Sequence, residues 1–218
     1  EIYTLSLHDA LPIWSAYALL IDGAFLNKKL ASRLKKGQRP KADDIEQECK
    51  RIMARSELAD LGLLRIFYYH ARPCTDQICH PISKQKTDLG STPEARYYNE
   101  LFKSLELKSN FALRLGETNA VGWRLGDKAA KDVYRNPRPP KDSDLVPDIR
   151  QKGVDMRIGI DISWLAMRRL VTTLVVVTGD SDFIPVFKLA RREGVRVYLE
   201  TLGHGVRHEL KAHADLVF

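Results

Sequence analysis

Residues 174–185 read LVVVTGDSDFIP, an apolar run that ends at Gly179 and is followed by Asp180 and Asp182. A continuous apolar run without alternation is typical of a strand buried on both faces of a parallel sheet. Gly179 permits a tight exit from this strand because glycine has no Cβ. Ligands bind beyond the carboxyl ends of the strands in open α/β sheets. The stretch therefore predicts two carboxylates at the functional edge of such a sheet.

The rest of the chain alternates between strand and helix patterns. Strand patterns are found at residues 17–22, 63–71, 111–117, 121–125, 172–178, 194–202 and 214–218. Helix patterns are found at residues 23–36, 42–58, from 92 onward, and at 153–170, 182–193 and 205–214. We predict loops at residues 72–91 and, as a polar, proline-bearing loop or insertion, at about 126–150. This order predicts an α/β fold with a mainly parallel central sheet covered on both faces.

Residues 1–13, EIYTLSLHDALPI, match the in-frame translation of a common short-read sequencing adapter codon by codon. A signal peptide is disfavoured because no positively charged segment precedes the apolar part. We interpret these residues as an artefact and expect a single domain over residues 14–218. The natural chain is then expected to start upstream of Trp14, and the last residues, ADLVF, fall inside a predicted strand.

Charge and cysteine content narrow the class of protein. The chain has a net charge of +7, and residues 14–218 alone carry +9 because residues 1–13 hold Glu1 and Asp9 and no Lys or Arg. A basic balance favours a polyanionic partner. The three cysteines, Cys49, Cys74 and Cys79, favour a reducing compartment, and we expect a cytoplasmic protein. No apolar run approaches the roughly 18 residues that span a bilayer, so we expect no membrane partner.

Acidic residues stand at three strand exits or helix starts. Asp22 follows the apolar run 17–21, Asp155 lies in KGVD at 152–155, and Asp180 and Asp182 follow the run 174–177. If the strands before Asp22 and Asp180 are neighbours, the carboxylates converge, and like charges so close need compensation. Mg²⁺ or Mn²⁺ would supply the compensating positive charge, because both ions prefer oxygen ligands. Each acid also has a structural alternative as a turn, a helix cap or a first-turn residue.

Three stretches resemble the NYN domain family, whose members have a PIN-like nuclease fold. They are IDGAFL at 21–26, KGVDMRIGIDI at 152–162 and VVVTGDSDFIPVFKLARREGVRVYL at 175–199. The resemblance covers residues 17–218, and residues 36–150 are much less diagnostic. It implies a Rossmann-like three-layer α/β/α sandwich, RNA as the substrate and metal-dependent phosphodiester hydrolysis. One departure is Phe25, because many relatives carry Asn three residues after the first Asp.

The resemblance and the residues together give a site hypothesis. Asp22, Asp155, Asp180 and Asp182 are expected to be the catalytic and metal-binding residues, with Mg²⁺ or Mn²⁺ as the cofactor. Water would attack phosphorus in line, without a covalent intermediate. The expected substrate-binding residues are Ser181, Lys152, Arg157, Arg191 and Arg192, the basic ones through phosphate contacts. Asp161, six residues after Asp155, points to another side of the helix and is expected to be structural.

Two alternatives remain open at this stage. A haloacid-dehalogenase-type phosphatase also pairs an early Asp with a late GD motif, but it needs a second acid at the position that Ala24 occupies. A non-catalytic module that binds RNA or protein on a nuclease-like fold suits the basic charge equally well. Whether the protein forms a homo-oligomer or takes a protein partner is also open.

Overall fold

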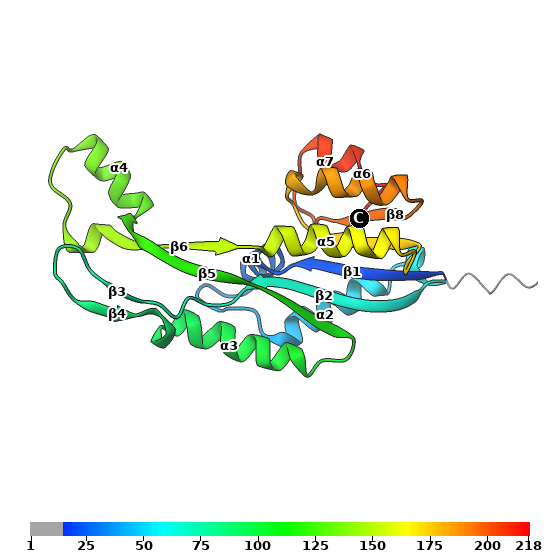
Figure 1. Ribbon diagram of the computed structural model, residues 1–218, viewed down its shortest axis with the longest axis horizontal. Coiled ribbons are helices and arrows are strands. Elements are labelled where there is room, and N and C mark those ends of the chain that lie inside the picture. The colour runs from blue at the N-terminus through cyan, green and yellow to red at the C-terminus, as the bar shows by residue number, and fades with distance from the viewer. Residues whose placement is uncertain (1–14) are drawn as a thin grey trace, which may run out of the picture.

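The protein is an α/β sandwich built on a seven-stranded sheet (Figure 1). The computed structural model describes residues 15–218, so the interpretation of residues 1–13 lies outside the described residues. The strand order is β6-β5-β2-β1-β7-β8-β9. Neighbouring strands run parallel except for β5 and β6, which are antiparallel. The predicted mainly parallel sheet is confirmed, and the strands before Asp22 and Asp180 are neighbours at its centre.

The central strands form where the sequence is apolar without alternation. Within the described chain the sheet consists of β1 (Ala16–Asp22), β2 (Gly62–Ala71), β5 (Phe111–Leu125), β6 (Leu145–Lys152), β7 (Thr173–Val177), β8 (Arg196–Glu200) and β9 (Leu216–Val217). All five residues of β7 are buried, because side chains on both of its faces meet helices. This is the burial expected from the run LVVV.

Helices cover both faces of the sheet (Figure 1). One face packs against α1 (Gly23–Arg33), α2 (Ala42–Met53) and α3 (Pro93–Glu106), with Leu26 and Ile45 in its core. The other face packs against α5 (Val154–Met167), α6 (Ile184–Arg192) and α7 (His208–Ala212), with Ile158 and Phe187 in its core. The three-layer α/β/α architecture is therefore confirmed. Among residues 15–218, no helix is long and apolar enough to cross a membrane.

The segment between β5 and α5 differs from the sequence prediction. Residues 111–125 form one strand rather than two, and Gly122 sits at an irregularity in its pairing with β6. The loop expected at 126–150 contains α4 (Asp127–Arg135) and most of β6, and the loop expected at 72–91 contains a small sheet of β3 (Gln77–Cys79) and β4 (Lys86–Asp88). In Figure 1, β5 and β6 extend together past the other strands to α4. We call residues 117–152 the arm.

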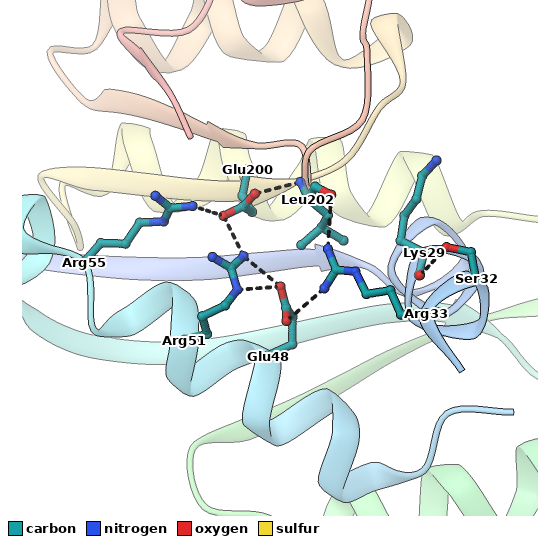
Figure 2. A network of polar contacts seen from close by, with 8 residues as sticks. All are labelled: Lys29, Ser32, Arg33, Glu48, Arg51, Arg55, Glu200 and Leu202. Carbon is teal, nitrogen blue, oxygen red and sulfur yellow. Dashed lines mark hydrogen bonds and ion pairs between the residues drawn. The ribbon is translucent and has the colours of Figure 1, made fainter. Parts of the chain in front are cut away.

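A buried ion network fixes the turn that follows β8 (Figure 2). Glu200 is 1 % exposed, and its carboxylate accepts hydrogen bonds from Arg51 and Arg55 at 3.1 and 2.8 Å. It also accepts the backbone N–H of Leu202 at 2.7 Å, and the carbonyl of Leu202 accepts from Arg33 at 3.1 Å. Leu202 has φ +55°, a left-handed conformation that a non-glycine residue rarely adopts. The network therefore holds the start of the turn that carries His204 and Arg207.

Candidate functional site

Three elements bring the four predicted aspartates to one edge of the sheet. Asp22 is the last residue of β1, and Asp180 and Asp182 follow the exit of β7, which pairs with β1 in parallel. Asp155 lies in the first turn of α5. Because the carboxyl ends of parallel strands meet at one edge, Asp22 and Asp180 become neighbours although 158 positions of chain separate their numbers.

Local hydrogen bonds hold two of these carboxylates. Asp22 caps α1, and its Oδ1 accepts the backbone N–H of Phe25 at 3.1 Å. Thr178 donates its hydroxyl to Asp22 Oδ2 at 3.5 Å and accepts the backbone N–H of Asp180 at 3.1 Å. Asp180 Oδ1 in turn accepts the N–H of Asp182 at 2.9 Å. Thr178 therefore links the exits of the two central strands.

Burial and neighbouring carboxylates raise the pKa values of Asp22 and Asp155. Burial raises the pKa of Asp22, the N–H of Phe25 opposes this change, and the charges of Asp155 and Asp180 raise the pKa further. Burial also raises the pKa of Asp155, and the charges of Asp180 and Asp182 add to it. Like charges disfavour the ionised form of each neighbour. All four acids thus share one electrostatic environment.

The residues fit a divalent cation in chemistry, but their side chains do not form a finished ligand set. Within residues 15–218, no three His, Cys, Asp or Glu side chains are gathered as metal ligands. Oxygens of Asp22 and Asp180 are instead used as backbone caps, as described above. The donor set itself, oxygen-only and anionic, is the one that Mg²⁺ and Mn²⁺ prefer.

A pocket of about 330 Å³ opens at the same edge. Its lining joins the carboxylates of Asp22 and Asp180 to the cationic side chains of Lys28, Lys29 and Arg207. A larger hollow of about 710 Å³ lies at the opposite edge of the sheet, but the ionisable side chains in its lining are limited to Arg169 and Glu193. The smaller pocket therefore combines groups for a cation with groups for an anion at the edge of the sheet where ligands bind in open α/β folds.

Comparison with known proteins assigns the family. The sequence model of the NYN domain matches residues 84–218. The chain belongs to the NYN domain family. This agrees with the resemblance found in the sequence, and NYN domains have a nuclease-like fold of the PIN type. The matched region contains Asp155, Asp180 and Asp182, whereas Asp22 lies before it and joins the NYN acids through the pairing of β1 with β7.

Other comparisons add little. No curated protein matches the chain. A crystal structure of a protein of unknown function from Vibrio parahaemolyticus has a TM-score of 0.49 and 12% identity, covering 95% of this chain and 93% of the other. A likeness at this level has no bearing on the activity of the NYN domain described here.

The predicted substrate-binding residues divide into two groups. Ser181 lines the pocket, and Arg207 Nη1 donates to its hydroxyl at 3.5 Å. Lys152 is the last residue of β6, and Arg157 lies in the first turns of α5. Both side chains are exposed, and both residues are close to Asp155 in the sequence. Arg191 and Arg192 are different. They end α6, which runs from the GDSD motif back to the start of β8, at the opposite edge of the sheet.

Arg191 also has a structural partner. Its Nε donates to Asp215 Oδ1 at 2.9 Å, and Asp215 Oδ2 accepts the N–H of Val197. The structure thus does not bring Arg191 and Arg192 to the acidic edge, because one helix length separates them from Asp182. Asp161 behaves as expected for a structural acid, since its Oδ2 accepts from the hydroxyl of Tyr69 at 2.8 Å and from Arg114 at 3.0 Å.

Sequence reasoning missed several residues of the pocket. Lys28 and Lys29 lie on α1, the helix that Asp22 caps. Their short distance from Asp22 along the predicted helix is the signal that could have placed them in the pocket. Arg207 and His204 come from the turn after β8, and no sequence pattern tied that turn to the pocket. Thr178 was read only as the end of a strand, yet it contacts both Asp22 and the backbone of Asp180.

Proposed function

We propose that this NYN domain is a metal-dependent ribonuclease that hydrolyses RNA phosphodiester bonds at the acidic edge of its sheet. The observation that carries the proposal is the meeting of acids and cations at one edge of the sheet. Asp22 and Asp155 have pKa values raised partly by neighbouring carboxylates, and Lys28, Lys29 and Arg207 line the same edge. A pure binder of polyanions gains nothing from such crowded acids.

Asp22, Asp155, Asp180 and Asp182 are the residues that would hold Mg²⁺ or Mn²⁺. A bound cation of this kind lowers the pKa of water and neutralises charge on a phosphodiester. The carboxylates would turn from their backbone donors to serve as ligands, which the exposed positions of Asp155 and Asp182 allow. The raised pKa values also favour this change, because a cation relieves the repulsion between the acids.

The basic side chains would bind the backbone of the substrate. Lys28, Lys29 and Arg207 line the same pocket as Asp22 and Asp180, so they would contact phosphates that approach these acids. Phosphate contacts of this kind orient a nucleic acid without reading its sequence. Lys152 and Arg157, exposed on either side of Asp155, would extend the track, and the hydroxyl of Ser181 would donate to a phosphate oxygen.

A second candidate is a non-catalytic module that binds RNA or protein on the same fold. The use of Asp22 and Asp180 as helix caps favours it, because a cap gives each of these acids a structural role. The two candidates differ in one observable property. A nuclease cleaves RNA only with a divalent cation, and a binding module binds RNA without cutting it under any of these conditions.

The first experiment is therefore a cleavage assay on a mixture of single-stranded and hairpin RNA. The full chain is assayed with Mn²⁺, with Mg²⁺ and with EDTA, beside an Asp180→Asn/Asp182→Asn variant. We expect cleavage with metal, none with EDTA and a loss of at least about 100-fold in the variant. Asp161→Asn is the matched control, because it makes the same chemical change in a carboxylate outside the pocket. RNA binding without cleavage under either metal would favour the binding module.

Three further proposals follow from the sequence. Residues 14–218 would form a single domain, and the arm would belong to it. The three cysteines are free in the structure, which is in keeping with a cytoplasmic location. Homo-oligomer formation and protein partners stay predictions, and light scattering of the purified protein measures the first directly.

A further inference from the structure

Phe25 occupies an unusual place in the pocket. It is half-buried, follows Asp22 on α1, and donates its backbone N–H to the Asp22 carboxylate. Its ring lies against the exit of β7, because a Cβ at Gly179 would meet the ring at 2.7 Å. Phe25 thus places a flat apolar surface beside Asp22 and beside Gly179, the residue before Asp180.

Other groups beside this ring are suited to a nucleotide. The imidazole of His204 is exposed, and its centroid is 6.2 Å from that of Phe25, with the planes tilted by 56°. Lys29 Nζ lies 5.5 Å from the centroid of Phe25. Lys28 and Arg207 complete the basic part of the lining. An aromatic surface with cations around it is the usual combination in sites for single-stranded nucleic acids.

The spacing decides how a base would lie. Stacked rings need about 3.5 Å of separation, so a base held between two rings needs about 7 Å between their centroids. The 6.2 Å between Phe25 and His204, together with their tilt, is too short for this arrangement. A base would therefore stack on one face of Phe25 with His204 at its edge, and Lys29, which lies over this ring, would move to the attached phosphate.

We propose that Phe25 and His204 form a stacking platform for one unpaired base beside the acidic edge, and that Lys28, Lys29 and Arg207 bind the adjoining phosphates. In a duplex both faces of each base are already stacked, so this platform selects single-stranded RNA. The proposal that this platform selects the substrate rests on the proposed nuclease function. The binding of single-stranded RNA that the platform predicts can be measured without any cleavage.

The test compares two substitutions of Phe25. Phe25→Leu keeps apolar volume against Gly179 but removes the flat surface, and Phe25→Trp keeps an aromatic surface. Fluorescence anisotropy measures the binding of a uridine-rich single strand and of a duplex to the full chain in EDTA. We expect Phe25→Leu to bind the single strand about tenfold more weakly than the wild type does, and to bind the duplex as tightly as the wild type does. We expect Phe25→Trp to bind the single strand as tightly as the wild type does.

The matched control is Trp164→Leu, which removes an aromatic ring that is 51% exposed in the C-terminal half of α5, and urea unfolding of each variant shows that it is folded. Wild-type affinity of folded Phe25→Leu for the single strand would overturn the platform. A separate cleavage assay distinguishes the two proposals. Phe25-dependent binding without metal-dependent cleavage overturns the nuclease and supports the platform, whereas cleavage with unchanged binding by Phe25→Leu overturns the platform alone.

Discussion

At the scale of single residues, Asp22 performs two tasks whose demands differ. As the cap of α1 it accepts the N–H of Phe25, which stabilises the charged form of its carboxyl. As a member of the acidic edge it is half-buried beside Asp155 and Asp180, which disfavours that charge. Burial and like charges outweigh the cap, because the pKa of Asp22 is raised. The ionised carboxyl of Asp22 therefore reduces the stability of the folded protein.

This balance predicts how stability depends on pH. The pKa of Asp22 is higher in the folded chain than its ordinary value of 3.8, so the native state binds more protons than the unfolded state between those two pKa values. The contribution of Asp22 to the free energy of unfolding therefore falls as pH rises from about 4 through the raised pKa. Asp22→Asn keeps an oxygen for the N–H of Phe25, and we expect it to reduce this fall.

Urea unfolding in EDTA over a series of pH values measures the effect. Asp60→Asn is the matched control, because it changes an exposed carboxyl in the turn before β2. Adding Mn²⁺ at neutral pH should raise the stability of the wild type and change Asp22→Asn less. An equal pH dependence in the wild type and Asp22→Asn would contradict the crowded acidic edge.

At the scale of elements, the turn after β8 depends on one carboxylate. Glu200 joins Arg51 and Arg55 of the α2 region to the N–H of Leu202 (Figure 2). Glu200→Ala removes this acceptor and leaves the arginines without their buried partner, so we expect a loss of about 3 kcal/mol in the free energy of unfolding. Because the turn leads to His204 and Arg207, the variant should also bind RNA more weakly.

Two variants make this prediction specific. Glu200→Gln keeps an acceptor for Leu202 but removes the charge, and it should lose less stability than Glu200→Ala. Glu106→Ala changes an exposed glutamate at the end of α3 and should stay within about 0.5 kcal/mol of the wild type. Urea unfolding compares all three. A similar small loss in Glu200→Ala and Glu106→Ala would show that the network does not hold the turn.

The elements also show what sequence patterns can reveal. The run before GDSD identified β7, because a strand buried on both faces has no polar alternation. The cap at Thr92 with Pro93 after it identified the start of α3. In contrast, α4 spans only nine residues, and its apolar side of Ala129, Ala130 and Val133 is small and half-buried among polar residues. Its neighbours include Pro137, Pro139 and Pro140, which favoured a loop.

The sequence predicted residues of the candidate site only where an acidic motif directly follows a strand. Asp22, Asp180 and Asp182 came together because β1 and β7 are parallel neighbours, a relation that alternating strands and helices allow but do not fix. Arg191 was misplaced because nearness to GDSD in the sequence ignored the direction of α6. Arg207 was missed because its place depends on the turn after β8, which long-range contacts shape.

At the scale of the whole molecule, the arm stands apart from the sandwich (Figure 1). Its pairing continues to Leu125 and Leu145, and Gly126 donates its N–H to the carbonyl of Asp144 at 2.8 Å. Beyond that point the chain contributes α4, on which Lys128, Lys131 and Arg135 are exposed. Arg138 is instead engaged by Asp132 and Asp144. The tip of the arm therefore presents three exposed cations on α4, beside the exposed carboxylates of Asp127 and Asp142.

We expect the tip to bind RNA without contributing to folding. Replacing residues 126–144 by Asn-Gly joins Leu125 to Leu145 through a two-residue hairpin turn, so the β5–β6 register survives. The free energy of unfolding should change by less than about 1 kcal/mol, because α4 has no buried residue. Binding of single-stranded RNA should weaken, and the slope of log affinity against log salt should fall by about 0.7 for each phosphate that is no longer neutralised, or about 2 for three cations.

A substitution variant separates charge from shape in this experiment. Lys128→Gln/Lys131→Gln/Arg135→Gln keeps the arm and removes the three exposed cations of α4, so its salt slope should fall by about 2. A loss of several kcal/mol on shortening would show instead that the arm supports the sandwich. An unchanged slope in both variants would place RNA entirely on the sandwich, with Lys28, Lys29 and Arg207 as its main cations.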